Sequence, residues 1–421
     1  MKPHRPVYLA AQAITPFIGK GNPAFIMKGH PEYGKRENPT LEDHLTRAVQ
    51  EVLRTDGGTD PALVQRGYVS NFGGELFANQ GHLGAMVSRA EPGLAGVGFT
   101  RLEAACASGG TALAAGVDAI QAGVDVVLVV GVEVQTRVRA REGGEYLARA
   151  SHYATERAID DFTFPALLTR RAKAYKETYG VTDRDLAHFA VKAYANANRN
   201  PLAHMHAVTM TLEQAATAGD RNPNFLSNPE LKPHLKVSDC SQVSDGAAAV
   251  LLASAEGLRK LGRAEDDAVA VRSYGFHTAP LGQVNDLLRL ETTAGAVAEA
   301  LADAGIGPGE VQVAEVHDCF TIAELLMYEA IGWAEQGRGV DLILSGYTHR
   351  DGVIPVNTGG GLLAFGHPVG ATGVKQAAEI YRQMKGLCGE YQLARRPGLG
   401  LTVNMGGDDR SVVSMVFENL G

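Results

Sequence analysis

The sequence has few cysteines and no long apolar run. No segment reaches 18 uninterrupted apolar residues, so it contains no candidate for a membrane-spanning helix. Only four cysteines occur in 421 residues, and they are far apart with no metal-ligand spacing. This excludes a disulfide framework and predicts no metal site. The cysteines, expected to be free thiols, are Cys106, Cys240, Cys319 and Cys388.

Acidic residues outnumber basic ones, which gives a formal net charge of −8. Such a balance argues against nucleic acid or an anionic membrane as the main partner. Residues 133–236 are an exception, with 15 Lys and Arg against 12 Asp and Glu, whereas the rest has 24 against 35. This mildly basic segment could hold a phosphorylated ligand, or it could simply be a solvated face. The start shows no signal-peptide pattern and the end no peroxisomal tripeptide, so we expect a cytoplasmic protein.

Strand-like and helix-like segments alternate along the chain, which predicts an α/β architecture. Residues 124–130 form an apolar run typical of a buried strand, and 311–316 followed by 321–331 predict a strand and a helix. The strand-like starts at residues 7 and 268 suggest a weak internal duplication. Three units are therefore expected. They are an N-terminal half (1–132 and 237–264), a helical and loop insertion (133–236) and a C-terminal half (265–421).

Cys106 lies where an extended approach gives way to small residues and then to the Ala-rich run 111–123. A thiol at a helix N-terminus meets unsatisfied N–H groups and the positive end of the helix dipole, which favour the nucleophilic thiolate. On this segment alone, a small buried core cysteine is an equally good interpretation.

Four separated segments are unusually specific in combination. They are Ala105–Gly110, Ser244–Ala249, His317–Phe320 and Asn357–Gly373. Together, and across essentially the whole chain, they resemble the thiolase superfamily. The sequence His-Asp-Cys-Phe at 317–320 is similar to the sterol-carrier-protein type and its bacterial relatives. The resemblance implies two similar βαβαβαββ halves in a five-layer αβαβα arrangement, with an insertion that binds coenzyme A.

Thioester exchange and Claisen condensation need a nucleophile, a base, a second acid/base group and donors for two oxyanions. His367, in a Gly-His-Pro turn among glycines, is suited to deprotonate Cys106 because imidazole titrates near neutrality. An isolated loop histidine is more often a surface residue, but the glycines permit close approach of a ligand. Where most thiolases are expected to carry asparagine, this chain has His317. The resemblance implies that His317 and His367 jointly stabilise the thioester enolate oxygen.

The C-terminal glycine turn departs from the commoner thiolase pattern. Many thiolases carry there a cysteine that serves as the second acid/base, whereas this chain has Asn404, which cannot shuttle a proton. The resemblance to the sterol-carrier type implies that Cys319 takes over this role. It also implies that the N–H groups of Gly406 and Cys106 form the second oxyanion hole.

Two further positions are candidates for contact with coenzyme A. Ser241 aligns with a serine that contacts the coenzyme in related enzymes, although a plain loop serine is as good an interpretation. Phe320 packs on the pantetheine arm or in the core.

His204 and His206 lack a carboxylate or cysteine at ligand spacing, so a solvated helix end is expected there. Cys240 and Cys388 are interpreted as structural.

The predicted function is acyl transfer between coenzyme A thioesters, as 3-ketoacyl-CoA thiolysis or as acetyl-CoA condensation. Coenzyme A and acetyl-CoA are then substrates, and no permanently bound cofactor is expected. A homodimer or homotetramer is implied by the resemblance. One alternative is a biosynthetic acyltransferase that works with an accessory OB-fold/zinc-ribbon protein. A second is a non-catalytic lipid- or acyl-CoA-binding member of the family.

Overall fold

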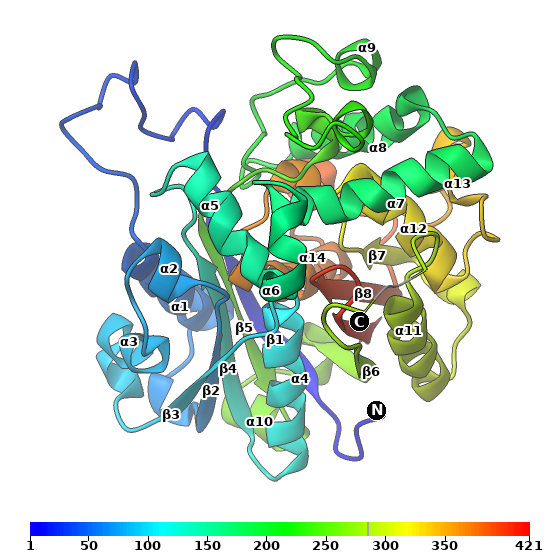
Figure 1. Cartoon of the computed structure of the whole chain (residues 1–421). Helices are drawn as coiled ribbons and strands as arrows, with labels where there is room; N and C mark the ends of the chain where they lie inside the picture. Colours follow the sequence, from blue (N-terminus) through cyan, green and yellow to red (C-terminus); the bar gives the residue numbers. More distant parts are fainter. Residues whose placement is uncertain (284–285) are drawn as a thin grey trace.

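The computed structural model describes residues 1–283 and 286–421. Its described strands form one mixed sheet in the order β3-β2-β4-β5-β1-β6-β9-β8-β7 (Figure 1). The sheet is continuous because β1 pairs with both β5 and, through Tyr8 and Leu9, β6. The α/β architecture expected from the alternating pattern is confirmed.

The first half has the element order βαβαβαββ before and after the insertion. Its strands are β1 (Tyr8–Ile14), β2 (Arg66–Ser70), β3 (Gly98–Leu102), β4 (Val126–Glu133) and β5 (Gly246–Ala253). Its helices are α1 (Leu41–Arg54), α2 (Gly74–Phe77), α3 (Leu83–Ala90), α4 (Ser108–Gln121) and α10 (Ala255–Lys260). Every residue of β4 and β5 is buried, since helices cover both faces of the sheet.

The second half repeats this order, except that one strand is shortened to a single β-bridge. Its strands are β6 (Val269–Thr278), β7 (Val313–Glu315), β8 (Leu399–Gly406) and β9 (Ser411–Asn419). Its helices are α11 (Glu291–Ala304), α12 (Thr321–Ile331), α13 (Gly339–Leu344) and α14 (Thr372–Lys385). In the described residues, the position of a fifth strand is occupied by a single bridge between Ala314 and Val356.

Helices α4 and α14 form the middle of five layers. They pack against each other and against strands of both halves, while α1 and α3 cover the outer face of the first half and α11 that of the second (Figure 1). Helix α4 is rich in glycine and alanine because it is enclosed on both sides. A Cβ at Gly109 would lie 2.6 Å from the Gly373 nitrogen. The close approach of the two helices brings their N-termini together.

The segment between β4 and β5 contains five helices and covers α12. They are α5 (Ala140–Leu147), α6 (Tyr153–Glu156), α7 (Thr163–Tyr179), α8 (Asp183–Ala197) and α9 (Leu212–Ala216). Helices α7 and α8 contact α12, and α5 contacts α2 and α7. No helix in the described part of the chain is long and apolar enough to cross a bilayer.

Candidate active site

Cys106 lies in the turn that enters α4, two residues before the helix begins. The residue before it, Ala105, has a φ of 50°, a left-handed conformation that is unusual for a residue with a side chain. Ser108 holds this turn, since its hydroxyl donates to the Ala105 carbonyl at 2.6 Å and accepts from the Ala104 N–H. The sequence prediction of a thiol at the start of a helix is therefore correct.

Three functional groups from separate parts of the chain converge at this point. One potential ligand atom from each of Cys106, His317 and His367 lies within 4.8 Å of the others, and all three residues are buried. The two imidazole rings stand nearly perpendicular, with centroids 5.1 Å apart. His317 follows β7, and His367 precedes α14. The fold thus assembles a thiol with two imidazoles that the sequence separates by more than 200 residues.

Hydrogen bonds around Asn404 assign the proton of His317. The Asn404 carbonyl oxygen accepts from the Gly110 N–H at 2.9 Å, so its amide nitrogen donates to the Cys106 carbonyl at 3.0 Å and faces His317 Nδ1 at 3.3 Å. Nδ1 is therefore the acceptor, and in the neutral ring Nε2 carries the proton. His317 Nε2 is buried without a partner in the described residues. It is a donor available to a substrate oxygen.

His367 is in the opposite tautomer. The Thr372 hydroxyl donates to the Pro368 carbonyl at 3.0 Å, so its oxygen accepts from His367 Nδ1 at 2.7 Å. The proton is then on Nδ1, and the free lone pair is on Nε2, which is also buried without a described partner. His367 can accept the Cys106 proton, and it becomes a second donor only after it has done so.

Burial changes the acidity of all three groups. It raises the pKa of the Cys106 thiol to about 12, although the N–H groups of Gly407 and Cys106 favour the thiolate. Burial lowers the pKa of His367 to about 3, and burial together with His367 lowers that of His317 well below its usual range. The expectation that the helix N-terminus favours a free thiolate was wrong, because desolvation dominates. The resting site holds a neutral thiol beside neutral imidazoles.

The pH dependence of Cys106 alkylation follows from these pKa directions. In the free enzyme, we expect its rate with iodoacetamide to rise about tenfold per pH unit from pH 6 to 9, since the thiolate fraction grows until the raised pKa is reached. Mass spectrometry of the Cys106 peptide at each pH measures this rate. A plateau near or below pH 8 would contradict the raised pKa.

Cys319 and Cys106 face a common cavity of about 560 Å³. His367, Ser241 and Phe320 also line it. Burial, the nearby Cys106 and Asp318 raise the pKa of the Cys319 thiol well above its usual value. A neutral Cys319 next to the nucleophile is able to donate a proton first and to accept one later.

The coenzyme candidates Ser241 and Phe320 lie side by side on the cavity wall. The Ser241 N–H donates to the Cys319 carbonyl at 2.9 Å, and Cys240 forms a bridge with Phe320. Phe320 is nearly fully buried and packs on Phe164, so it belongs both to the core and to the cavity wall. Cys240 also lines the cavity, whereas Cys388 is buried away from it.

His204 differs from its expected position. Instead of ending a solvated helix, it is buried at the cavity, with Nδ1 2.8 Å from the Ser244 hydroxyl and Nε2 3.1 Å from the Lys20 carbonyl. Ser244 also accepts weakly from the His367 N–H at 3.3 Å. His204 thereby supports the loop that carries His367. Burial lowers its pKa to about 4.

Two buried carboxylates hold the loops that form the site. Asp318 accepts from the Leu362 N–H at 2.6 Å, and a Cβ at Gly361 would collide with its carboxylate. Glu133 accepts from the N–H groups of Phe72 and Gly370 at 2.8 and 3.1 Å. Burial raises the pKa of each carboxyl to about 7. Asp318 joins the 317–320 turn, and Glu133 joins the loop after β2, to the glycine-rich segment around His367.

Three residues around the catalytic groups were not identified as functional from the sequence. Asn404 was recognised only as unable to shuttle a proton, Thr372 was not singled out, and Gly407, next to the predicted oxyanion donor Gly406, directs its N–H toward the Cys106 sulfur. A Cβ at Gly406 would lie 2.2 Å from the Ala104 carbonyl oxygen. The glycine turn therefore packs directly on the nucleophile turn.

Cys106, His317 and His367 could in principle hold a metal ion. A metal ligand needs a free lone pair, but the Asn404 amide leaves His317 with a proton on Nε2. These hydrogen bonds therefore suit acyl transfer better than metal coordination.

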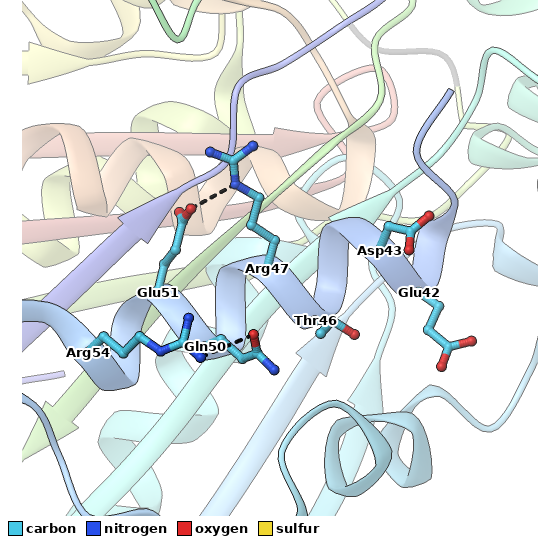
Figure 2. A pocket seen from close by; sticks show the side chains of 7 residues that line it. All are labelled: Glu42, Asp43, Thr46, Arg47, Gln50, Glu51 and Arg54. Carbon is cyan, nitrogen blue, oxygen red and sulfur yellow. Dashed lines mark hydrogen bonds and ion pairs between the residues drawn. The ribbon is translucent and has the colours of Figure 1, made fainter. Parts of the chain in front are cut away.

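A second depression, of about 290 Å³, lies along the outer face of α1 (Figure 2). It is lined by one helix, and its charges are partly neutralised, since Arg47 pairs with Glu51 at 2.7 Å (Figure 2). No thiol or imidazole lines it. The cavity at Cys106 is the better candidate for chemistry.

Comparison with known proteins agrees with this geometry. The models "Thiolase, N-terminal domain" and "Thiolase C-terminal domain-like" match residues 29–256 and 273–419. The chain is 35% identical to an acetyl-CoA acetyltransferase of Methanothermobacter thermautotrophicus, over 94% of this chain and 99% of the relative. It is 27% identical to sterol carrier protein 2 of Gallus gallus, over 92% of this chain and 72% of the relative.

Solved structures with the same fold are more distant in sequence. A structure described as "Ltp2-ChsH2(DUF35) aldolase" has a TM-score of 0.77 at 18% identity, and covers 100% of both chains. Human mitochondrial 3-ketoacyl-CoA thiolase has a TM-score of 0.69 at 17% identity, over 99% of each chain. These structures share the five-layer α/β architecture, in which this chain brings a buried thiol and two imidazoles together. The chain belongs to the thiolase family.

Proposed function

We propose that this protein catalyses acyl transfer between coenzyme A thioesters through an acyl-enzyme on Cys106, as 3-ketoacyl-CoA thiolysis or acetyl-CoA condensation. The observation that carries the proposal is the convergence of Cys106 with His317 and His367, whose unpartnered Nε2 atoms are in opposite protonation states. A base and an oxyanion donor are thus both in place before substrate binds.

In the first half-reaction, His367 Nε2 takes the proton of Cys106, and the sulfur attacks the thioester carbon. The N–H groups of Cys106 and the 406–407 turn stabilise the tetrahedral oxyanion. The departing coenzyme A thiolate takes the proton of Cys319. The acyl group is then bonded to Cys106, His367 is an imidazolium, and Cys319 is a thiolate.

In the second half-reaction, Cys319 removes the α-proton of a second acetyl-CoA. His317 Nε2–H and the His367 imidazolium stabilise the enolate oxygen. The enolate carbon attacks the acyl carbon, and Cys106 leaves and recovers its proton from His367. Both cysteines and His367 return to their starting states, so the proton balance closes.

Mass measurement of the intact protein after incubation with acetyl-CoA tests this proposal. We expect an adduct of one acetyl group that disappears when coenzyme A is added. The alternative of a non-catalytic acyl-CoA-binding protein predicts binding without an adduct, and that result would overturn the proposed function.

We place the phosphates of coenzyme A near Lys20 and Arg139. Both line the cavity, and no carboxylate of the described residues does. The net +3 of residues 133–236 is a weaker guide, because several of its cations are paired in the interior. These interior pairs are Arg171 with Asp408, Lys192 with Glu324, and Lys236 with Asp239.

Coenzyme A binding should therefore weaken as salt rises, since exposed charges are screened beyond about 8 Å at physiological ionic strength. Calorimetric titration at several salt concentrations measures this dependence. We expect Arg139→Ala to weaken binding and to flatten the dependence, and Arg221→Ala, an exposed change outside the cavity wall, to leave both unaltered. A flat dependence in the wild-type protein would contradict this placement.

We also propose a homo-oligomer, since the edge strand β3 is only partly covered and offers unpaired backbone groups. An accessory OB-fold/zinc-ribbon protein is a further proposal, supported by the neighbour described with a DUF35 component. Size-exclusion chromatography with mass detection tests both proposals. The recombinant protein alone should elute with the mass of a homo-oligomer, and the protein purified from its native host should elute with a second polypeptide.

A further inference from the structure

The cavity beside Cys106 has a contiguous apolar wall. Phe320 follows Cys319 and packs on Phe164, with ring centroids 6.0 Å apart. Phe162 packs edge-on against Phe225 at 5.3 Å. All four rings line the cavity. An apolar surface thus extends outward from Cys106 and Cys319.

Helix α5 closes this wall with two adjacent glycines, Gly143 and Gly144, in a helix of eight residues. Glycine weakens a helix interior, so each needs a reason to be there. At Gly144 the reason is a contact within the protein, because an added Cβ would lie 3.0 Å from the Phe162 ring.

Gly143 has no such reason. Its φ is not positive, and an added Cβ would find Val138 at 3.6 Å and Phe77 at 3.8 Å, which are ordinary contacts. The residue nevertheless lines the cavity. A larger side chain at position 143 would therefore occupy space inside the cavity.

We propose that Gly143 determines substrate size, and that the space over it receives the far end of a bulky apolar acyl group, such as a phenyl ring. The inference rests on the proposed function, since it assigns the acyl side of the same thioester site. The aromatic wall favours a ring or branched chain over acetyl, because an acetyl group would leave most of this surface uncovered.

The experiment compares thiolysis of acetoacetyl-CoA with that of 3-oxo-5-phenylpentanoyl-CoA. Attack of Cys106 on the 3-keto carbon of the latter breaks the C2–C3 bond, and Cys319 protonates C2 to release acetyl-CoA. Coenzyme A then removes 3-phenylpropanoyl-CoA from the enzyme. We expect the wild-type kcat/KM to favour the phenyl substrate.

The variant Gly143→Leu should lower kcat/KM for the phenyl substrate about tenfold or more, and change that for acetoacetyl-CoA by less than about twofold. Gly143→Ala should raise Tm. Gly309→Leu, the same change at an exposed glycine with open space around it and outside the cavity wall, is the matched control and should alter neither substrate.

Binding of 3-phenylpropanoyl-CoA, measured by calorimetry, provides a readout that does not need turnover. Equal losses for both substrates in Gly143→Leu, or a wild-type protein that cleaves only acetoacetyl-CoA, would overturn the inference and leave the proposed function standing. Absence of any Cys106 adduct with either substrate would instead overturn the proposed function.

Discussion

The variant Cys106→Ala should form no acyl-enzyme and show no measurable thiolysis. Of the four cysteines, only Cys106 lies in the cluster with both imidazoles, and His367 Nε2 has no hydrogen-bond partner among the described residues. Intact mass after acetyl-CoA treatment and a thiolysis assay measure the two losses. Because alanine is close in size to cysteine, we expect little change in Tm.

Cys388→Ala is the matched control, since Cys388 is buried away from the cavity. It should retain the adduct and the activity. Peptide mapping of the wild-type adduct locates the acyl group. An acyl group on Cys240, which also lines the cavity, would contradict the assignment of Cys106 as the nucleophile.

The variant Cys319→Ala should still be acylated at Cys106 but should slow the carbon–carbon step by about 10² to 10⁴-fold, the usual contribution of a general acid or base. Cys319 lines the cavity with Cys106, and the resemblance noted in the sequence predicts that it replaces the acid/base cysteine missing at Asn404. Two assays separate the roles: adduct formation by mass, and exchange of the acetyl-CoA α-protons with solvent deuterium.

Cys319→Ser should restore little of this rate, because a hydroxyl is far less acidic than a thiol near neutral pH. Exchange at the wild-type rate in Cys319→Ala would transfer the role to another group, with His317 as the next candidate. Loss of both acylation and exchange, together with a lowered Tm, would show instead that Cys319 mainly supports the architecture of the site.

Glycines allow the turns around Cys106 to pack closely. Gly109 touches the start of α14, and Gly406 packs on the Ala104 carbonyl. A methyl group at Gly109 would separate the turn of Cys106 from the start of α14, and one at Gly406 would separate the turn of Cys106 from the 406–407 turn. The distance between thiol and imidazole therefore depends on residues that have no chemistry of their own.

The sequence by itself determined the family and the α/β class, and it predicted Cys106, His317, Cys319 and His367 as the reacting side chains. Motifs such as His317–Phe320 are local. A strand-to-helix turn can therefore be predicted from a few neighbouring residues. Helix α12 was predicted with its observed bounds, because its apolar spacing and the preceding turn mark both ends.

Only the tertiary structure decided the protonation of the site. Whether Cys106 is a thiol or a thiolate depends on desolvation, which no local pattern measures, and the helix N-terminus alone suggested the wrong direction. The tautomers of His317 and His367 are set by Asn404 and Thr372, and the first of these partners is 87 residues away in the chain. His204 likewise became a buried residue of the cavity because the glycine loop folds over it. Acidity, tautomer and cavity shape are properties of packing, and packing joins residues that the sequence keeps apart.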